Sequence, residues 1–302
     1  MSLNAPPLFP RFKPPTLEDR PFLEPRLQAS AADITEGSFA TLYLWRNAYN
    51  LRWCLWKDWA LVVGRDADGD FGLMPFGPPA RDAAARELVR FLKEEFSAPA
   101  ARLEWCDDRF VAEMSRDEAV LFTPRRDDFD YVYASDSLIR LPGQDYQAKR
   151  NHIHRFRRAH PVQYAPLGLP ELSACRDAAE EWYRRNPPAP GSPLAGEREA
   201  LDEALRHFEA LDLKGGIVSI HGRIEAFAIG SRLNSETAII HFEKADPDIP
   251  GLYSVINQQF VENAWKEVPW INREDDAGLP GLRKSKQSYH PARLLQKFRG
   301  LS

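Results

Sequence analysis

Ionisable side chains gather in the last third of this 302-residue chain, at the ends of apolar, strand-like runs. Carboxylates and histidines accept protons near neutral pH, and tyrosines and lysines donate them, so such a gathering indicates acid–base chemistry. His290 is one candidate acid or base, because an unperturbed histidine has a pKa near 6.5; turn formation with Pro291 is the other interpretation. The residues of this stretch are Glu243, Lys244, Asp246, Arg273, Glu274, Asp275, Asp276, Lys284, Tyr289 and His290.

Three neighbouring carboxylates in INREDDAG, at Glu274, Asp275 and Asp276, raise the alternative of a divalent metal. Hard cations prefer oxygen ligands, but the spacing does not match a calcium-binding loop. Arg273 beside Glu274 instead predicts an ion pair that orients Asn272. We therefore predict no metal site.

Positive charge is concentrated in two other segments. GLPGLRKSK places Gly281 at the start of a short helix, with cationic side chains along it, and a helix N-terminus can bind an anion. The second segment, 146–161, contains no acidic residue. Both are candidate docking points for a phosphate or an RNA backbone, and a merely solvated helix face is the open alternative. The residues are Arg283, Lys284 and Lys286 in the first segment and Lys149, Arg150, Arg155, Arg157 and Arg158 in the second.

The elements that must position these residues follow from hydrophobic periodicity. Strand-like segments at 215–221, 223–233 and 237–243 are joined by short turns and predict an antiparallel meander. Along its last strand, alternation places Ile239, His241 and Glu243 on one face. A helix is predicted over 251–265, followed by a strand at 269–272, a helix at 281–288 and a terminal strand at 292–298.

Earlier segments alternate between the two periods. Helices are predicted at 81–96, 141–161, 169–186 and 196–213, and strands at 58–66, 102–106, 109–114 and 130–134. The loop 186–196, rich in proline and glycine, ends regular structure and is predicted to be mobile. This order predicts an α/β or α+β fold with mixed, mostly antiparallel sheets.

Composition limits the class of protein. With 43% hydrophobic residues, the chain can bury a large core, and we expect two domains of roughly 150 residues each. A net charge of −4 argues against an overall nucleic-acid-binding charge. Three unpatterned cysteines favour a reducing compartment, and no signal-peptide or membrane-spanning run is evident, so we expect a cytoplasmic protein.

Three long motifs carry a resemblance to a known family: GQDYQAKRNHIHRF, FEKADPDIPGLYSVINQQF and INREDDAGLPGLRKSKQSYHP. They resemble a bacterial family related to the C-terminal domain of phosphatidylglycerol lysyltransferase, and the resemblance covers nearly the whole chain. It implies two tandem GNAT-like domains, as in Fem-type peptidyltransferases that use aminoacyl-tRNA. We place these domains at 1–135 and 136–302, with the active cleft in the second.

The resemblance implies an acyl- or aminoacyl-transferase that acts on an amine or hydroxyl of a small molecule or peptide. Acyl transfer needs a base, an acid and donors to the oxyanion. Glu243 is the predicted base, with a simple ion pair to Lys244 or Arg273 as the open alternative. Tyr289 lies where GNAT enzymes often keep a tyrosine that protonates the leaving group; a packing role is the other interpretation. The predicted substrate-binding residues are His241, Lys244, Asp246, Asn272, Arg273 and Glu274.

The expected donor is acyl-CoA or aminoacyl-tRNA. GNAT proteins bind the CoA pyrophosphate with a glycine-rich turn whose backbone N–H groups face the phosphates. Here that turn reads EKADPDIPGLY, with one glycine, Gly251, and aspartates that repel phosphate. The loss of this turn favours a different donor, and it also motivates a competing hypothesis of a non-catalytic metabolite-, peptide- or RNA-binding protein. The residues predicted to bind the donor or its phosphates are Lys149, Arg150, Gly281, Arg283, Lys284 and Lys286. Phospholipid aminoacylation is a third possibility, by analogy with the lysyltransferase.

Overall fold

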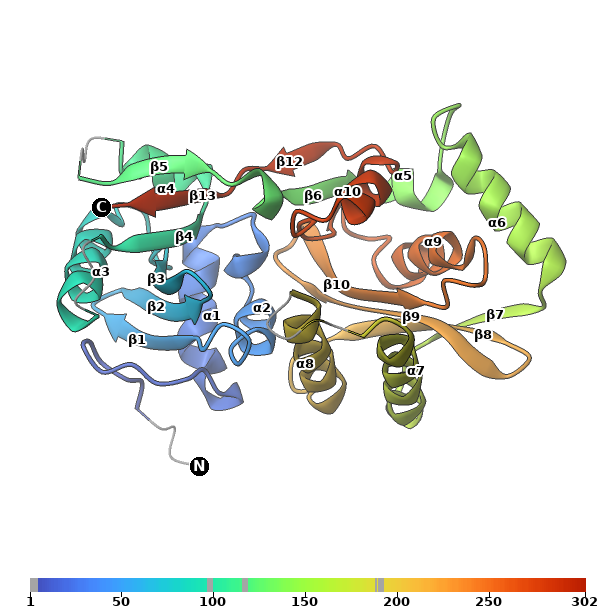
Figure 1. Ribbon diagram of the computed structural model, residues 1–302, viewed down its shortest axis with the longest axis horizontal. Helices are drawn as coiled ribbons and strands as arrows, with labels where there is room; N and C mark the ends of the chain where they lie inside the picture. The colour runs from blue at the N-terminus through green and yellow to red at the C-terminus, as the bar shows by residue number, and fades with distance from the viewer. Residues whose placement is uncertain (1–4, 97–99, 116–118, 188, 190–192) are drawn as a thin grey trace. The chain divides into compact units, whose positions relative to one another are not determined.

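The computed structural model describes residues 5–96, 100–115, 119–187, 189 and 193–302. It divides into two compact units (Figure 1). Unit 1 comprises Met1–Asp130, Asp275–Gly278 and Leu295–Ser302, and unit 2 comprises Tyr131–Glu274 and Leu279–Leu294. The predicted second domain included all of 136–302, whereas Asp275–Gly278 and Leu295–Ser302 belong to unit 1.

Unit 1 is built around a sheet in the order β1-β2-β3-β4-β13-β5, with mostly antiparallel pairs among its described strands. Its strands are β1 (Arg52–Trp56), β2 (Trp59–Asp66), β3 (Gly69–Leu73), β4 (Arg102–Cys106), β5 (Leu121–Pro124) and β13 (Phe298–Leu301). Its helices are η1 (Leu17–Asp19), α1 (Arg20–Ser30), η2 (Thr35–Gly37), α2 (Phe39–Leu44), α3 (Asp82–Glu95), α4 (Asp108–Glu113) and η3 (Arg126–Asp128).

Two predictions in this region meet different outcomes. The helix predicted over 81–96 is confirmed as α3, whose apolar stripe is buried. The strand predicted at 109–114 is wrong, because this segment forms α4. Asp107 caps α4 by accepting a hydrogen bond from the Phe110 N–H at 2.7 Å, and such a cap favours helix over strand.

Unit 2 carries a sheet in the order β12-β6-β11-β10-β9-β8-β7. Its strands are β6 (Asp130–Ala134), β7 (Val162–Pro166), β8 (Lys214–Ile220), β9 (Arg223–Arg232), β10 (Thr237–Ala245), β11 (Trp270–Asn272) and β12 (Arg293–Leu295). Its helices are α5 (Ser135–Arg140), α6 (Gln147–Ala159), η4 (Leu169–Glu171), α7 (Leu172–Arg185), α8 (Pro193–Arg206), α9 (Leu252–Ala264) and α10 (Pro280–Gln287).

The predicted meander is confirmed as β8, β9 and β10. His221 and Gly222 both have positive φ, which suits the two-residue turn between β8 and β9. Asn234 forms the next turn, because its Oδ1 accepts hydrogen bonds from the Glu236 and Thr237 N–H groups. These two short turns, one set by backbone conformation and one by local hydrogen bonds, explain why this sheet could be predicted from the sequence.

Helices cover both faces of the unit 2 sheet: α9 lies on one face, and α7 and α8 lie on the other (Figure 1). On the α9 face, Val255, Ile256 and Phe260 pack against Ala238 and Ile240 of β10 in a continuous core. The helices predicted over 141–161, 169–186, 251–265 and 281–288 are confirmed as α6, α7, α9 and α10. The helix predicted from 196 begins earlier, at Pro193, inside the predicted loop, of which residues 188 and 190–192 lie outside the described residues.

The end of the chain departs from the prediction of one terminal strand. Residues 293–295 form β12 in the unit 2 sheet, and residues 298–301 form β13 between β4 and β5 in the unit 1 sheet. Lys297, which is fully buried, separates the two strands. Among the described residues, no helix combines the length and the apolar character needed to cross a membrane.

Lys297 is held by two carboxylates in unit 1. Its Nζ lies 2.8 Å from both Asp130 and Glu36, and it donates to Thr35 Oγ1 at 3.2 Å. Burial raises the pKa of Glu36 to about 7, and the nearby ammonium opposes that shift. A buried lysine of this kind fixes the start of β13, because charges inside a protein must be paired.

We predict that Lys297→Met lowers the free energy of unfolding by about 3–5 kcal/mol, because it leaves two buried carboxylates without their cation. Urea denaturation followed by circular dichroism measures the change. Lys284→Met is the matched control: Lys284 is exposed, and its substitution should change stability by about 0.5 kcal/mol or less. Equal effects of the two substitutions would contradict this role for Lys297.

Candidate functional site

The backbone of unit 2 opens where β10 and β11 part. These parallel strands pair from Thr237 with Trp270 to Ile239 with Asn272, and their common register ends there. Beyond this point the chain after β11 stays on the other side: Arg273 N–H donates to Tyr131 O and Tyr131 N–H donates to Glu274 O. Side chains, rather than backbone hydrogen bonds, therefore join β10 to the segment after β11.

On the α9 face, the joining pair is Arg273 and Glu243, with Nη2 and Oε1 3.2 Å apart. Glu243 Oε2 also accepts a hydrogen bond of 2.9 Å from Asn257 Nδ2 of α9. The Arg273 guanidinium lies 4.8 Å from the Tyr289 ring centroid and 5.6 Å from that of Tyr133. With Lys149, these residues form what we call the arginine–tyrosine cluster: Lys149, Tyr133, Glu243, Asn257, Arg273 and Tyr289.

Lys149 of α6 is the residue of this cluster that can accept a proton near neutral pH. Its Nζ lies 3.9 Å from the centroid of the Tyr289 ring. Burial and, to a smaller extent, the nearby Arg273 lower the pKa of Lys149 to about 8, and Glu243 opposes the shift. Near neutral pH an appreciable fraction of this amine is therefore unprotonated and able to accept a proton.

Hydrogen-bonding capacity in the cluster is left unused. Among the described residues, the buried Arg273 Nη1 and Asn257 Oδ1 have no hydrogen-bond partner. Buried polar atoms are normally paired, so this unused donor and this unused acceptor each call for a polar partner. Glu243 and Arg273 keep 12% and 11% of their side chains exposed, which leaves the cluster a path to solvent.

On the opposite face, His241 makes a second connection across the opening. Its Nδ1 lies 2.9 Å from Glu274 Oε1, and its Nε2 lies 2.8 Å from Ser231 Oγ of β9. Asn272 Oδ1 accepts from the Glu274 N–H at 2.8 Å, and Glu274 has a φ of 57°. The predicted residues Asn272 and Glu274 thus hold His241, and Ser231 was not predicted, because a lone serine in a strand gives no sequence signal.

A β-bulge at His241 explains why these residues occupy two faces. The register of β10 with β9 shifts between Ile240 and Phe242, so that His241 is an extra residue. An extra residue reverses the alternation beyond it. The predicted common face of Ile239, His241 and Glu243 is therefore wrong: His241 bonds to Ser231 on one side, and Glu243 bonds to α9 on the other.

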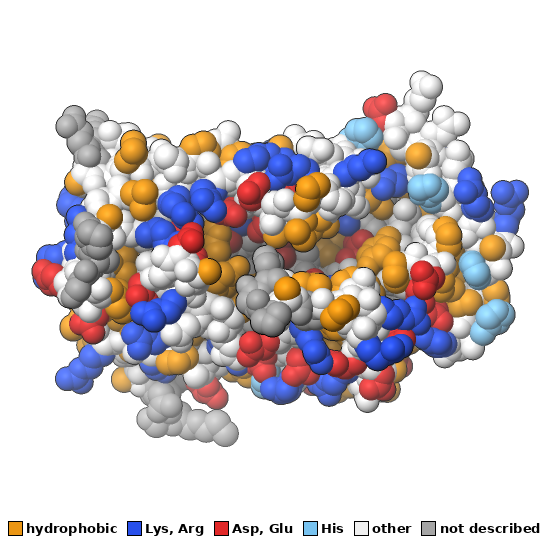
Figure 2. All heavy atoms as spheres, viewed as in Figure 1, with side chains coloured by type: hydrophobic (Ala, Val, Ile, Leu, Met, Phe, Trp, Pro, Cys, Tyr) orange, Lys and Arg blue, Asp and Glu red, His pale blue; other side chains and the backbone are white. Residues whose placement is uncertain are grey.

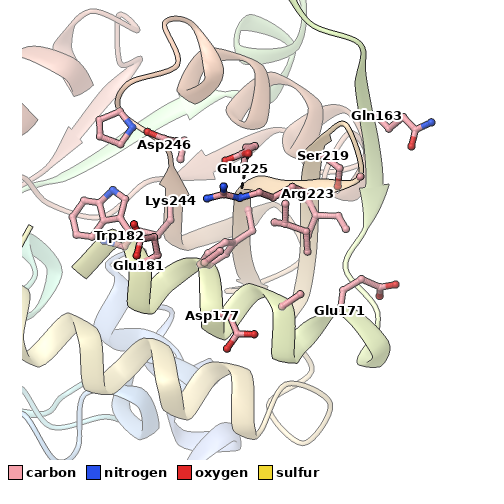
Figure 3. Close-up of a pocket in the computed structure, with 18 of the residues that line it drawn as sticks. Gln163, Glu171, Asp177, Glu181, Trp182, Ser219, Arg223, Glu225, Lys244 and Asp246 are labelled. Atoms are coloured by element: carbon pink, nitrogen blue, oxygen red, sulfur yellow. Dashed lines mark ion pairs between the residues drawn. The ribbon is translucent and has the colours of Figure 1, made fainter. Parts of the chain in front are cut away.

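Two predicted substrate-binding residues, Lys244 and Asp246, line a cavity of about 750 Å³ between α7 and the sheet (Figure 3). Ile217, Ile224 and Phe227 form its apolar part. Part of its charged lining is already paired, as Arg185 with Glu181 and Asp246 and as Arg223 with Glu225. The cavity suits a small ligand with an apolar body and charged ends.

Lys244 is the most buried charge in this cavity. Its Nζ lies 2.9 Å from Glu197 of α8 and 3.8 Å from the centroid of the Trp182 ring. Lys244 and Trp182 are both labelled in Figure 3. Burial lowers the pKa of Lys244, and Glu197 opposes this shift. Because Lys244 and Glu243 are adjacent in β10 and face opposite sides, this cavity is separate from the arginine–tyrosine cluster.

The predicted residues around α10 do not all join the cluster. Lys286 is buried, and its Nζ donates to the Arg273 carbonyl, which supports the Arg273 backbone. Lys284 and Gly281 are exposed, and Arg283 is half-buried. His290 is exposed with a φ of 51°, and its ring lies edge-on to Tyr146, as expected for the turn interpretation. On α6, Arg150 Nη1 donates to the Leu141 carbonyl.

Gly251 is the N-cap of α9 and lies close to the backbone of α6. It has a φ of 92°, and a Cβ built there would lie 2.8 Å from the His152 carbonyl oxygen. The backbone of α6 therefore covers the turn at which a phosphate would have to approach. Among the described residues, no group of three or more His, Cys, Asp or Glu side chains is placed to hold a metal ion.

Comparisons with known proteins show where this geometry belongs. The family described as "Phosphatidylglycerol lysyltransferase, C-terminal" matches residues 28–299. A Bacteroides thetaiotaomicron protein of unknown function is 34% identical, with a TM-score of 0.88 over 96% of this chain and 98% of that one. No curated protein matches.

More distant structures share the fold. The structure of L-PGS from Bacillus licheniformis has a TM-score of 0.67 at 13% identity and covers 93% of this chain and 91% of that one. FemX has a TM-score of 0.58 at 9% identity over 96% of each chain. The predicted fold class, tandem GNAT-like units with mixed, mostly antiparallel sheets, is confirmed.

We predict that substitutions in the cluster move the pKa of Lys149 in opposite directions. Glu243→Gln removes the attraction that raises it, so the pKa should fall below about 8. Arg273→Met removes a repulsion, so the pKa should rise. The pH dependence of amine-selective labelling, read at Lys149 by peptide mass spectrometry, measures both shifts. Exposed Lys284 serves as the internal control, and shifts of the same sign in both variants would contradict the arrangement.

We further predict that Gly251→Ala destabilises unit 2 by about 1–3 kcal/mol, because alanine at this φ is strained and its Cβ meets the His152 carbonyl. Gly281→Ala is the matched control, since a Cβ at that helical position meets nothing within 4 Å. Thermal unfolding of the two variants should show a lowered Tm for Gly251→Ala alone.

Proposed function

The chain belongs to the phosphatidylglycerol lysyltransferase C-terminal family, and from this premise we propose that it transfers an aminoacyl group from aminoacyl-tRNA to an amine or hydroxyl. The observation that carries the proposal is the arginine–tyrosine cluster. It combines an amine with a pKa of about 8 and a buried guanidinium N–H without a partner. Acyl transfer requires a proton acceptor and an oxyanion donor of these kinds.

The proposed step assigns a role to each group. The acceptor amine or hydroxyl attacks the ester carbonyl, a new C–N or C–O bond forms, and its proton passes to neutral Lys149. Arg273 Nη1 donates to the oxyanion. As the tetrahedral intermediate collapses, the bond to the ribose oxygen breaks, and this oxygen receives a proton from Tyr289, which Lys149 then reprotonates. Burial raises the pKa of Tyr289, so its hydroxyl remains protonated until then.

Glu243 has a different role in this proposal from that of the base. Both of its carboxylate oxygens are engaged, one by Arg273 and the other by Asn257. It therefore positions Arg273 and raises the pKa of Lys149. If a carboxylate were the base, the transfer rate would rise with pH in the acidic range instead of near pH 8. The pH dependence of the rate therefore separates the two roles.

The choice of an aminoacyl ester over acyl-CoA rests on the turn before α9. This turn has lost the glycines that expose backbone N–H groups, and the α6 backbone approaches Gly251 closely. A pyrophosphate would meet the His152 carbonyl oxygen, which repels anions. The family name points to phosphatidylglycerol as one hydroxyl acceptor to test beside small amines.

We predict that the protein, supplied with lysyl-tRNA or alanyl-tRNA and an acceptor, forms a product whose rate rises with pH through about 8 and then levels off. The reason is that the unprotonated form of Lys149 is the active one. Radiolabelled aminoacyl-tRNA with phosphatidylglycerol vesicles or hydroxylamine as acceptors measures the product. Lys149→Met and Tyr289→Phe should each lower the rate by about a hundredfold or more.

Control variants distinguish this role from a loss of folding. Lys284→Met should keep full activity, and the folded state of each variant is checked by circular dichroism. In Glu243→Gln the surviving activity should rise at a lower pH than in the unaltered protein. Stabilisation by aminoacyl-tRNA without any product would instead support a binding protein.

A further inference from the structure

The exposed arginines of α6 differ from those of α3, α7 and α8 in the way their charge is balanced. On α3, α7 and α8, exposed arginines are paired with nearby carboxylates, as for Arg90 with Glu87, Arg184 with Glu181 and Arg198 with Glu180. On α6, Arg155, Arg157 and Arg158 are exposed. In the part of the chain that the structure describes, none of these three has an ion-pair partner.

The excess of positive over negative side chains extends along the whole of α6. Segment 146–161 contains no acidic residue, and His152 and His154 are exposed beside the arginines. Figure 2 shows Lys, Arg and His side chains gathered over α6, on the right of the view. In a chain with a net charge of −4, an unpaired cationic helix is a local feature that solubility does not require.

One helix connects this surface to the arginine–tyrosine cluster. Ile153 and Phe156 bury one side of α6 in the core of unit 2. Lys149, on the first turns of the same side, reaches the Tyr289 ring. The arginines follow about two turns later on the sides that face solvent. A polyanion lying along α6 would therefore have one end close to Lys149.

We propose that the exposed face of α6, defined by Arg155, Arg157 and Arg158, is the docking surface for the RNA backbone of the donor. This inference rests on the proposed function, since it names where the tRNA binds. An RNA fits better than a membrane surface, because binding to a bilayer usually combines basic residues with exposed apolar ones. The outward residues of α6 are all polar or charged apart from Ala148 and Ala159.

The test compares two triple variants of the full chain that carry the same change in net charge. Arg155→Gln, Arg157→Gln and Arg158→Gln together remove the α6 surface. The control combines Arg176→Gln, Arg184→Gln and Arg198→Gln on α7 and α8, where each arginine is exposed and ion-paired. Binding of uncharged tRNA is measured by filter retention at several salt concentrations.

The α6 variant should bind tRNA about tenfold or more weakly. For this variant, the slope of log K against log salt should also be less steep by about two to three. The reason is that it neutralises fewer phosphates and so releases fewer counterions. The control variant should bind like the unaltered protein. Equal weakening in both variants, or binding that is unchanged in the α6 variant, would overturn the proposal. The proposal would also be overturned if the protein bound vesicles of phosphatidylglycerol and phosphatidylcholine in equal parts more tightly than tRNA, and if that binding depended on the α6 arginines.

The outcome is separable from that of the proposed function. Tight α6-dependent tRNA binding without any aminoacyl product would leave the docking surface standing and remove the transferase. Aminoacyl transfer that is unaffected by the α6 substitutions at physiological salt would support the transferase and exclude α6 as the docking surface.

Discussion

The parting of β10 and β11 is the constraint on which the rest of unit 2 depends. Once the backbone ladder ends at Ile239 and Asn272, only side chains hold the two segments together. Arg273 with Glu243 does so on one face, and His241 with Glu274 on the other. Because these polar groups are largely buried, each must keep its partner, and the sheet cannot open further without breaking a pair. The same residues thus define the opening and place reactive groups beside it.

A single extra residue in β10 decides which groups meet. The bulge at His241 turns Glu243 towards α9 and leaves Lys244 facing α7. Glu243 then holds Arg273 against two tyrosine rings, while Lys244 is enclosed by Glu197 and Trp182. Two neighbouring residues therefore serve two separate places, an acid–base cluster and a ligand-sized cavity. A strand with regular alternation would have put His241 and Glu243 together and dissolved both arrangements.

Local patterns account for what the sequence could predict. The meander, α9 and α10 follow from turn residues and apolar spacing within each segment, whereas the expectation that Glu243, Arg273 and Tyr289 share one site came from the family resemblance. The bulge at His241, the partner Ser231 and the division of residues 293–301 between two sheets depend on contacts with distant strands. Lys149 was predicted as a phosphate contact, because its burial beneath Tyr289, and hence its lowered pKa, arises only from tertiary packing.

Helix α6 lies beside the glycine-poor turn before α9 and also carries the surface that we propose for RNA docking. Its backbone lies against Gly251, so the His152 carbonyl oxygen, which repels anions, is close to the turn that precedes α9. The positive charge available to an anionic donor is found instead on side chains of α6. Backbone N–H groups at a helix terminus suit one compact pyrophosphate, whereas arginines spread along several turns suit an extended chain of phosphates. The position of one helix therefore favours a polymeric donor over a nucleotide-sized one.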